Sequence, residues 1–277
     1  MTSTTHAASQ ASEPSEASDA HETGGDVQTI ALEILTDEEL SVLLPDQGVV
    51  VTPVLSAVPA AERDAVRRTA FRGLVARGIV DPPGQEAVTA ALGAPAAVGD
   101  VALDLRVRND VLSALTLRQS ASAVVAVGRT TSSDQDFWYA HVVEDVVLLE
   151  EVGSDGLHRF ALGHARDLAA LLLGAVVHPE ASDGTGEDVE LAVAPDSEAP
   201  SELVERLGQA YLRADVLVVR REEGAALERP DLTGLFTGPR GSWSILARPG
   251  SQRAWAHAET LDSVRTRVAA LAAGARS

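Results

Sequence analysis

Histidines are the residues of this sequence best suited to bind a metal ion, because a neutral imidazole is a common metal ligand. Four of them lie in or beside expected strands: His141, His158, His164 and His257. None has another histidine four residues away, and the sequence contains no HExxH motif. His158 and His164 are separated by the end of an expected strand, so their side chains need not converge. The spacing therefore predicts no metal site.

Serine and carboxylate chemistry is equally poorly supported. A nucleophilic serine is expected in a Gly-x-Ser-x-Gly turn between a strand and a helix, and the sequence has no such turn. The adjacent acids Glu150–Glu151 and Glu222–Glu223 have the chemistry of an acid and a base, but at strand ends such pairs are more typical of solvated edges. The chain has no lysine, which excludes a Schiff base and a Walker A loop.

These observations predict no catalytic residue, no cofactor and no metal. An enzyme that uses scattered residues, or a small-molecule-binding α+β domain with an unrecognised site, remains the alternative.

The composition points to a protein partner. The net charge is −19, and all 22 basic residues are arginine. Nucleic acids and anionic membranes are bound mainly through basic side chains, so both are disfavoured. The absence of cysteine excludes disulfides and thiolate chemistry and suits a cytoplasmic protein. No apolar run approaches the roughly 20 residues that a membrane span needs.

The chain divides into segments of different composition. Residues 1–26 are rich in Ser, Thr, Ala and acids, have no apolar core of a signal peptide, and are predicted to form a disordered acidic tail. We expect an N-terminal α/β half at 27–180, a flexible acidic connector at 181–200 and a C-terminal α/β half at 201–277. Within the connector, Val189–Val193 has the pattern of a short strand.

Two similar units of several strands and one apolar helix are the main organising feature. Matching landmarks recur at nearly one offset, 92 residues for the first strand and 94 for the last. The first unit contains strands at Ala123–Arg129 and His158–Leu162 and a helix at Ala165–Val176, and the second contains strands at Asp215–Arg221 and Gln252–Ala256 and a helix at Thr260–Gly274. A sheet shared by both units is the simplest way to bury their helices.

The N-terminal region is expected to be mainly helical. Thr36 and Glu39 form a capping box that begins a helix, which Pro45 ends. A longer helix is predicted at Ala60–Ala76, with an apolar stripe opposite arginines and acids. Its basic cluster suits an acidic partner, although the interleaved acids favour an ordinary solvated face.

Several shorter segments complete the reading. We predict a loop at Pro53–Val58, a short helix at Gln85–Leu92 and a strand at Val101–Val107, while Asn109–Gln119 is ambiguous between strand and helix. Phe137–Val143 and Val146–Glu151 are predicted to form a hairpin.

The most natural contact element is the polar loop between two strands of the first unit, because loops held by a rigid scaffold often carry binding residues. We therefore assign a partner-binding role to Thr131, Ser132, Ser133 and Asp134. Phe236 is added because aromatic side chains anchor interfaces. Core packing is the competing interpretation for the aromatic residues of this aromatic-poor chain.

The order of features resembles the EspG family of proteins associated with actinobacterial type VII (ESX) secretion. The resemblance rests on Leu35–Leu40 with Leu43–Leu44, on Arg72–Val80, on the hairpin Tyr139–Glu151 and on the repeated α/β unit. It spans residue 30 to the C-terminus. The acidic tail and connector depart from the family pattern, and no family site residue carries over by motif.

This resemblance implies an α+β fold in which two quasi-repeated α/β halves share a central, mainly antiparallel β-sheet flanked by helical bundles. It implies a cytoplasmic, ATP-independent chaperone or adaptor that is not an enzyme. Its partner would be a helical secretion substrate, PE–PPE-like or another small helical client. A purely structural role in a larger complex is a third possibility.

Overall fold

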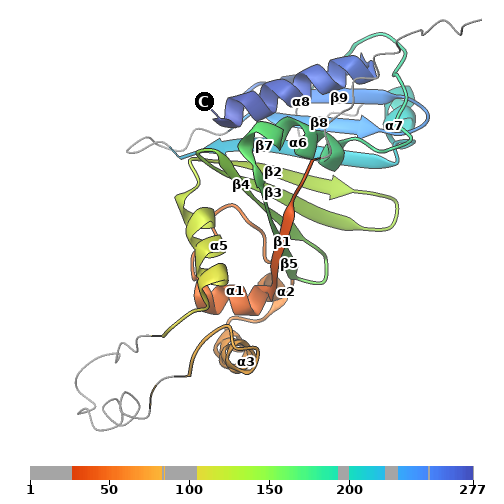
Figure 1. The fold of residues 1–277 in the computed structure, drawn as a ribbon. Helices are drawn as coiled ribbons and strands as arrows, with labels where there is room; N and C mark the ends of the chain where they lie inside the picture. Colours follow the sequence, from red (N-terminus) through yellow and green to blue (C-terminus); the bar gives the residue numbers. More distant parts are fainter. Residues whose placement is uncertain are drawn as a thin grey trace, which may run out of the picture.

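The computed structural model describes residues 27–82, 84, 105–192, 200–221, 230–248 and 250–276. The predicted acidic tail, the predicted helix Gln85–Leu92 and most of the predicted strand Val101–Val107 lie outside these residues. The described part of the chain is built on one antiparallel sheet in which the strands follow the order β1-β5-β4-β3-β2-β7-β8-β9-β10-β6 (Figure 1).

The strands are Ile30–Thr36 (β1), Ala123–Thr130 (β2), Gln135–Val143 (β3), Val146–Val152 (β4), Leu157–His164 (β5), Val189–Ala192 (β6), Leu212–Arg220 (β7), Leu232–Thr237 (β8), Ser242–Ala247 (β9) and Arg253–Glu259 (β10). The helices are Asp37–Leu43 (α1), Pro53–Ala57 (α2), Arg63–Ala76 (α3), Asn109–Ser120 (α5), Ala165–Asp167 (η1, a 3₁₀ turn), Leu168–Val176 (α6), Ser201–Leu207 (α7) and Leu261–Arg276 (α8).

The expected duplication is visible in this order. The meander β2-β3-β4-β5 is followed by α6, and the meander β7-β8-β9-β10 is followed by α8. Each meander also receives one extra antiparallel strand at its outer edge, β1 on β5 and β6 on β10. The fold is therefore α+β with two quasi-repeated halves, as the sequence predicts. The boundaries of the two halves as separate units stay a prediction.

The two halves meet where β2 pairs with β7. Eight residues of each strand are paired antiparallel, from Ala123 with Arg220 to Thr130 with Arg213. Because β2 and β7 are the first strands of the two meanders, their pairing makes a single sheet with related halves on either side.

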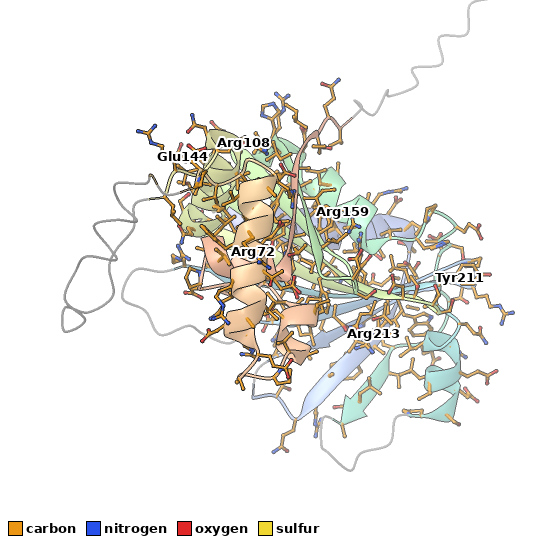
Figure 2. The ribbon with its side chains drawn as sticks, turned by 90° about the horizontal axis from the view of Figure 1, so that it is seen from below. Arg72, Arg108, Glu144, Arg159, Tyr211 and Arg213 are labelled. Atoms are coloured by element: carbon orange, nitrogen blue, oxygen red, sulfur yellow. The ribbon has the colours of Figure 1, made fainter. Side chains whose placement is uncertain are left out.

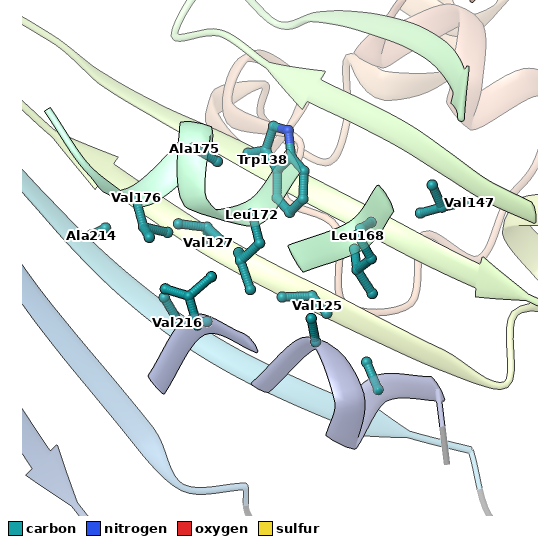
Figure 3. Packing of buried hydrophobic residues seen from close by; sticks show 14 of the residues in the cluster. Val125, Val127, Trp138, Val147, Leu168, Leu172, Ala175, Val176, Ala214 and Val216 are labelled. Carbon is teal, nitrogen blue, oxygen red and sulfur yellow. The ribbon is translucent and has the colours of Figure 1, made fainter. Parts of the chain in front are cut away.

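One face of this sheet is covered by α6 and α8, which pack against each other and across β2 and β7. Figure 3 shows the resulting core, in which valines of β2 and β7 meet leucines of α6. Val125, Val127 and Val216 are at most 1% exposed. We call this side the closed face.

The opposite face carries the remaining helices at its two ends. In the N-terminal half, α1, α3 and α5 form a second core with β4 and β5, which includes the fully buried Leu40, Leu74 and Leu148. In the C-terminal half, Leu203 and Leu207 of α7 pack with Trp243 of β9. The centre of this side lies between these two groups, and we call it the open face.

Most predicted elements agree with the structure; one prediction was wrong, one ambiguity is resolved, and one short strand is confirmed. Pro53–Val58 was predicted as a loop, but residues Pro53–Ala57 form α2, because Pro53 fits the first turn of a helix. The ambiguous segment Asn109–Gln119 is helical in α5. The strand expected at Val189–Val193 is present as β6.

Of the predicted strand Val101–Val107, the described end makes only an isolated bridge, between Val107 and Val80. The hairpin turn at Glu144–Asp145 is tight despite having no glycine, and Glu144 takes a φ of 50°. Within the described residues, no helix is both long and apolar enough to cross a bilayer.

The capping box at the start of α1 gives a direct test of local stability. The Thr36 hydroxyl accepts a bond from the Glu39 amide (3.2 Å), and the Glu39 carboxylate accepts one from the Thr36 amide (3.1 Å). We expect Thr36→Ala to lower the free energy of unfolding by about 1 kcal/mol, measured by urea denaturation. Thr52 precedes α2 without capping it, so Thr52→Ala should cost less than about 0.5 kcal/mol. Equal effects of the two substitutions would contradict the assigned cap.

Candidate partner-binding surface

A buried network of charged side chains fixes the helices of the N-terminal half to the sheet. At its centre is Glu150 of β4, which is fully buried. Its Oε1 accepts a hydrogen bond from Nδ1 of His158 (2.7 Å). Its Oε2 accepts bonds from Nε2 of His141 (2.8 Å) and from Nε of Arg118 on α5 (2.8 Å). Three strands and one helix therefore converge on one carboxylate.

Asp37 extends the network to two further helices. Its Oδ1 accepts a bond from Nε2 of His158 (2.7 Å), and its Oδ2 accepts bonds from the amides of Val54 (2.8 Å) and Leu55 (2.9 Å). Asp37 is the first residue of α1, and the two amides belong to the first turn of α2. The side chain of Asp37 thus joins α1, α2 and β5, and it is itself fully buried.

One expectation about these residues was wrong, and one set of contacts was not predicted. Glu150 was interpreted as part of a solvated strand edge, but it lies on an inner strand beneath α5, where its burial is complete. The convergence of His141 and His158 was not predicted, and diagonal positions on β3, β4 and β5 bring both to Glu150. The signal available in the sequence was the period of two along each strand, which places these residues on one face.

Burial and hydrogen bonding have opposite effects on the ionisation of this network. Burial raises the pKa of Glu150, but hydrogen bonds from His141 and His158 and the charge of Arg118 outweigh it, so that the pKa lies well below its usual value. Burial lowers the pKa of His158, but its bonds to Asp37 and Glu150 outweigh that effect and raise the pKa above 6.5. His158, with both ring nitrogens bonded to carboxylates, therefore keeps its second ring proton to higher pH than a free imidazole does.

The contacts of this network indicate a structural role and not a catalytic one. Both ring nitrogens of His158 are bonded to carboxylates, and its side chain is fully buried, so a substrate has no route to it. Within the described ranges, no group of three or more His, Asp or Glu side chains has the geometry of a metal site. A cavity of about 580 Å³ lies beside the network, with Arg118 and His141 in its wall.

The open face is the part of the sheet that has apolar side chains without full cover. Val124 and Ala126 of β2 and Leu217 and Val219 of β7 alternate with the buried residues of the closed face, and all four are only half-buried. Val50 and Val51 cover part of β2. Towards β8, Phe236 is half-buried and packs with the α7 cluster. A strand that is apolar on both faces, like Val216–Val219, is normally covered on both, so the open face is an apolar surface available for contact.

The predicted contact residues lie at one end of this surface. Thr131, Ser132, Ser133 and Asp134 form the exposed tip of the β2–β3 hairpin, closed by a bond from the Thr131 amide to the Asp134 carbonyl (2.9 Å). Asp134 also accepts a bond from the Ser154 hydroxyl (3.1 Å).

Phe236 is found at the same end of the sheet. Thr130 at the base of the hairpin pairs with Arg213, and Arg213 pairs with Phe236 on the next strand. The Arg213 guanidinium lies 5.6 Å from the centre of the Phe236 ring. The structure thus brings the five predicted residues to one end of the sheet; their role in binding stays a prediction. Figure 2 views the molecule from the side of α3 and shows where Arg213 and Tyr211 lie relative to that helix.

Sequence reasoning missed the β7 residues of this surface, Arg213, Leu217 and Val219. Four successive apolar residues, Val216–Val219, were read only as a strand. They also signalled that apolar side chains would point to both faces.

Comparison with known proteins identifies a solved structure with a similar fold. No protein-family model matches the sequence, and no curated protein is similar to it in sequence. A solved structure of the Mycobacterium tuberculosis type VII secretion system chaperone EspG5, in complex with the PE25–PPE41 dimer, is similar with a TM-score of 0.50. The alignment covers 88% of this chain and 95% of that chain, at 12% identity.

The fold is similar to that of EspG5. The similarity extends over both halves, because 88% of this chain is more than either half contains. The resemblance proposed from the sequence is confirmed at the level of fold. At this identity, the comparison assigns no site residue.

The Glu150 carboxylate is expected to be essential for stability. Glu150→Gln removes one charge and leaves Arg118 and the histidines without their common anionic partner. We expect the free energy of unfolding to fall by about 3–5 kcal/mol. The neighbouring Glu151 has a half-exposed side chain, so Glu151→Gln should change it by less than about 0.5 kcal/mol. Urea denaturation curves of both variants measure these free energies. A Glu150 variant as stable as the Glu151 variant would contradict the structural role of Glu150.

The protonation of His158 predicts a pH dependence. Its pKa is raised in the folded state, so the stabilisation it provides is fully present below the unfolded pKa of about 6.5. That stabilisation is lost as the pH rises through the higher folded pKa. In a histidine NMR titration of the intact chain, the ring signal of His158 should keep its protonated shift above pH 6.5. Titration of His158 at or below its ordinary pKa would show that the imidazole is neutral between the carboxylates.

Proposed function

We propose that this chain is a chaperone or adaptor of a type VII (ESX) secretion system. It binds the apolar tip of a helical client, a PE–PPE-like dimer or another small helical protein, and keeps the client soluble in the cytoplasm before export. Binding requires no ATP and no catalytic residue.

The observation that carries this proposal is the similarity in fold to EspG5 across 88% of the chain. EspG5 was solved in complex with the PE25–PPE41 dimer. A fold similar to that of a protein solved with a helical client supports a client-binding role for this chain, and we assign that role to the open face. The absence of lysine, which rules out a Walker A loop, supports ATP-independent binding.

The chemistry of the open face suits the tip of an apolar helix. Leu217 and Val219 offer an apolar floor, and the exposed hairpin Thr131–Asp134 offers a polar rim at one end. Interfaces of this kind combine a desolvated apolar centre with polar contacts at the margin. Covering the tip would keep it from aggregating with other copies of the client.

The second candidate is a small-molecule-binding or enzymatic α+β domain. The cavity of about 580 Å³ beside Arg118 and His141 supports it, because this size suits a small ligand. Recovery of a protein client would favour the chaperone over this second candidate.

Co-expression with each small helical protein encoded beside this gene tests the proposal. A stoichiometric complex is expected on affinity purification of the tagged full chain. Leu217→Gln places an amide in the desolvated contact, which costs about 1–3 kcal/mol and so weakens binding by about tenfold or more.

Leu112→Gln is the matched control, because Leu112 is an exposed leucine on α5, outside the open face. Its complex should have the affinity of the unaltered chain. Failure to recover any neighbouring protein, or equal affinities for the two variants, would contradict the proposed function or its surface respectively.

A further inference from the structure

A second surface lies on the outer side of the N-terminal helices, away from the sheet. A shallow groove of about 550 Å³ runs between α1 and α3. Its apolar lining consists of Val42, Pro45 and Phe71, and three arginines of α3 stand along it: Arg67, Arg68 and Arg72. Among the residues that the structure describes, no acidic side chain lines it. Figure 2 shows α3 in the foreground of the molecule, with Arg72 labelled on it.

Two of these arginines have no charged or hydrogen-bonded partner in the described part of the chain. Arg68 and Arg72 are exposed, and neither forms a hydrogen bond or an ion pair with any residue that the structure describes. By contrast, Arg67 approaches Asp64 (3.9 Å) and donates to the Ser41 hydroxyl (3.4 Å). Asp64 is the single acid of α3 and approaches only Arg67, so the positive charges at the groove are in excess.

The spacing of these charges is unfavourable for the helix alone. Arg68 and Arg72 are four residues apart, as are Arg63 and Arg67, and like charges at this spacing destabilise a helix slightly. The chain as a whole has a net charge of −19. Positive charge is thus concentrated in one stripe of an otherwise acidic protein. This stripe lies beside the apolar side chains of the groove.

We propose that the groove between α1 and α3 binds an acidic amphipathic helix of a partner protein. The apolar side of that helix would pack on Val42, Pro45 and Phe71, and its carboxylates would pair with Arg68 and Arg72. A cleft between two helices suits the helix-in-groove mode of recognition. Guanidinium groups pair well with carboxylates because two parallel hydrogen bonds can form.

A protein helix fits the groove better than a nucleic acid does. The floor is apolar, whereas phosphate binding needs a run of basic contacts and would oppose the overall negative charge. This site is separate from the open face, so the proposal does not depend on the proposed client.

A defined peptide tests the groove in the full chain. The probe is a fluorescein-labelled helical peptide of about five turns, with leucines on one side and glutamates on the other. Fluorescence anisotropy should show saturable binding that weakens as salt rises from about 0.05 to 0.3 M. The double variant Arg68→Glu/Arg72→Glu should raise the Kd about tenfold or more. These side chains have no partners within the described structure, so the variant should keep its fold, which circular dichroism checks.

The matched control is Arg240→Glu/Arg248→Glu, which makes the same change in net charge at two exposed arginines of the C-terminal half. Its Kd should equal that of the unaltered chain. No saturable binding, or an equal loss in both double variants, would overturn the proposal.

Three further probes separate the other occupants. A peptide with serine in place of leucine that binds equally well would remove the apolar part of the proposal. A single-stranded oligonucleotide that binds with the same variant dependence would replace the protein partner with a nucleic acid. Displacement of the probe by a synthetic peptide of residues 1–26 would assign the groove to this chain's own acidic segment.

Discussion

The pairing of β2 with β7 is the constraint on which the rest of the structure depends. Eight residues of each strand are paired, and the closed-face valines of both strands lie under α6 and α8. Without this pairing, each meander would expose the first strand as a free edge, and neither helix would have a complete floor. Both halves contribute equivalent strands and helices. As a result, α6 and α8 together cover the closed face of the sheet over β2 and β7. The duplication thus produces a closed face directly.

The extent of the open face is determined by the helices that differ between the two halves. In the N-terminal half, Glu150 and Asp37 hold α1, α2 and α5 over β3, β4 and β5. A buried carboxylate with three bonded partners is costly to break and fixes position as well as contributing stability. These helices therefore stay at one end of the sheet, and α7 lies at the other. Leu217 and Val219 between them remain half-buried, so the centre of the sheet keeps an apolar surface without full cover.

Much of the fold could be predicted from the sequence, because its signals are local. Thr36 and Glu39 mark a helix start, and the repeated strand–helix units are visible at nearly one offset. The Glu150 network could not be predicted, because it depends on which residues of three strands and three helices meet in space. Pro53–Ala57 was missed as a helix for a similar reason: five residues carry little periodic signal, and Asp37 binds two of their amides from outside. The hairpin Thr131–Asp134 and Phe236 share one end of the sheet through the β2–β7–β8 register, which sequence spacing does not reveal.

The central claim is that the open face and its hairpin hold a helical client, and the absence of cysteine in the chain permits a direct measurement. Single cysteines placed at Leu217, Ser133 and Leu112 can each be labelled with a maleimide in the free chain and in the purified client complex. The account predicts that the client slows labelling about tenfold or more at positions 217 and 133, since buried thiols are shielded from the reagent. Labelling at position 112 should be unchanged. Unchanged rates at both 217 and 133 in a complex that remains intact would show that the client binds elsewhere.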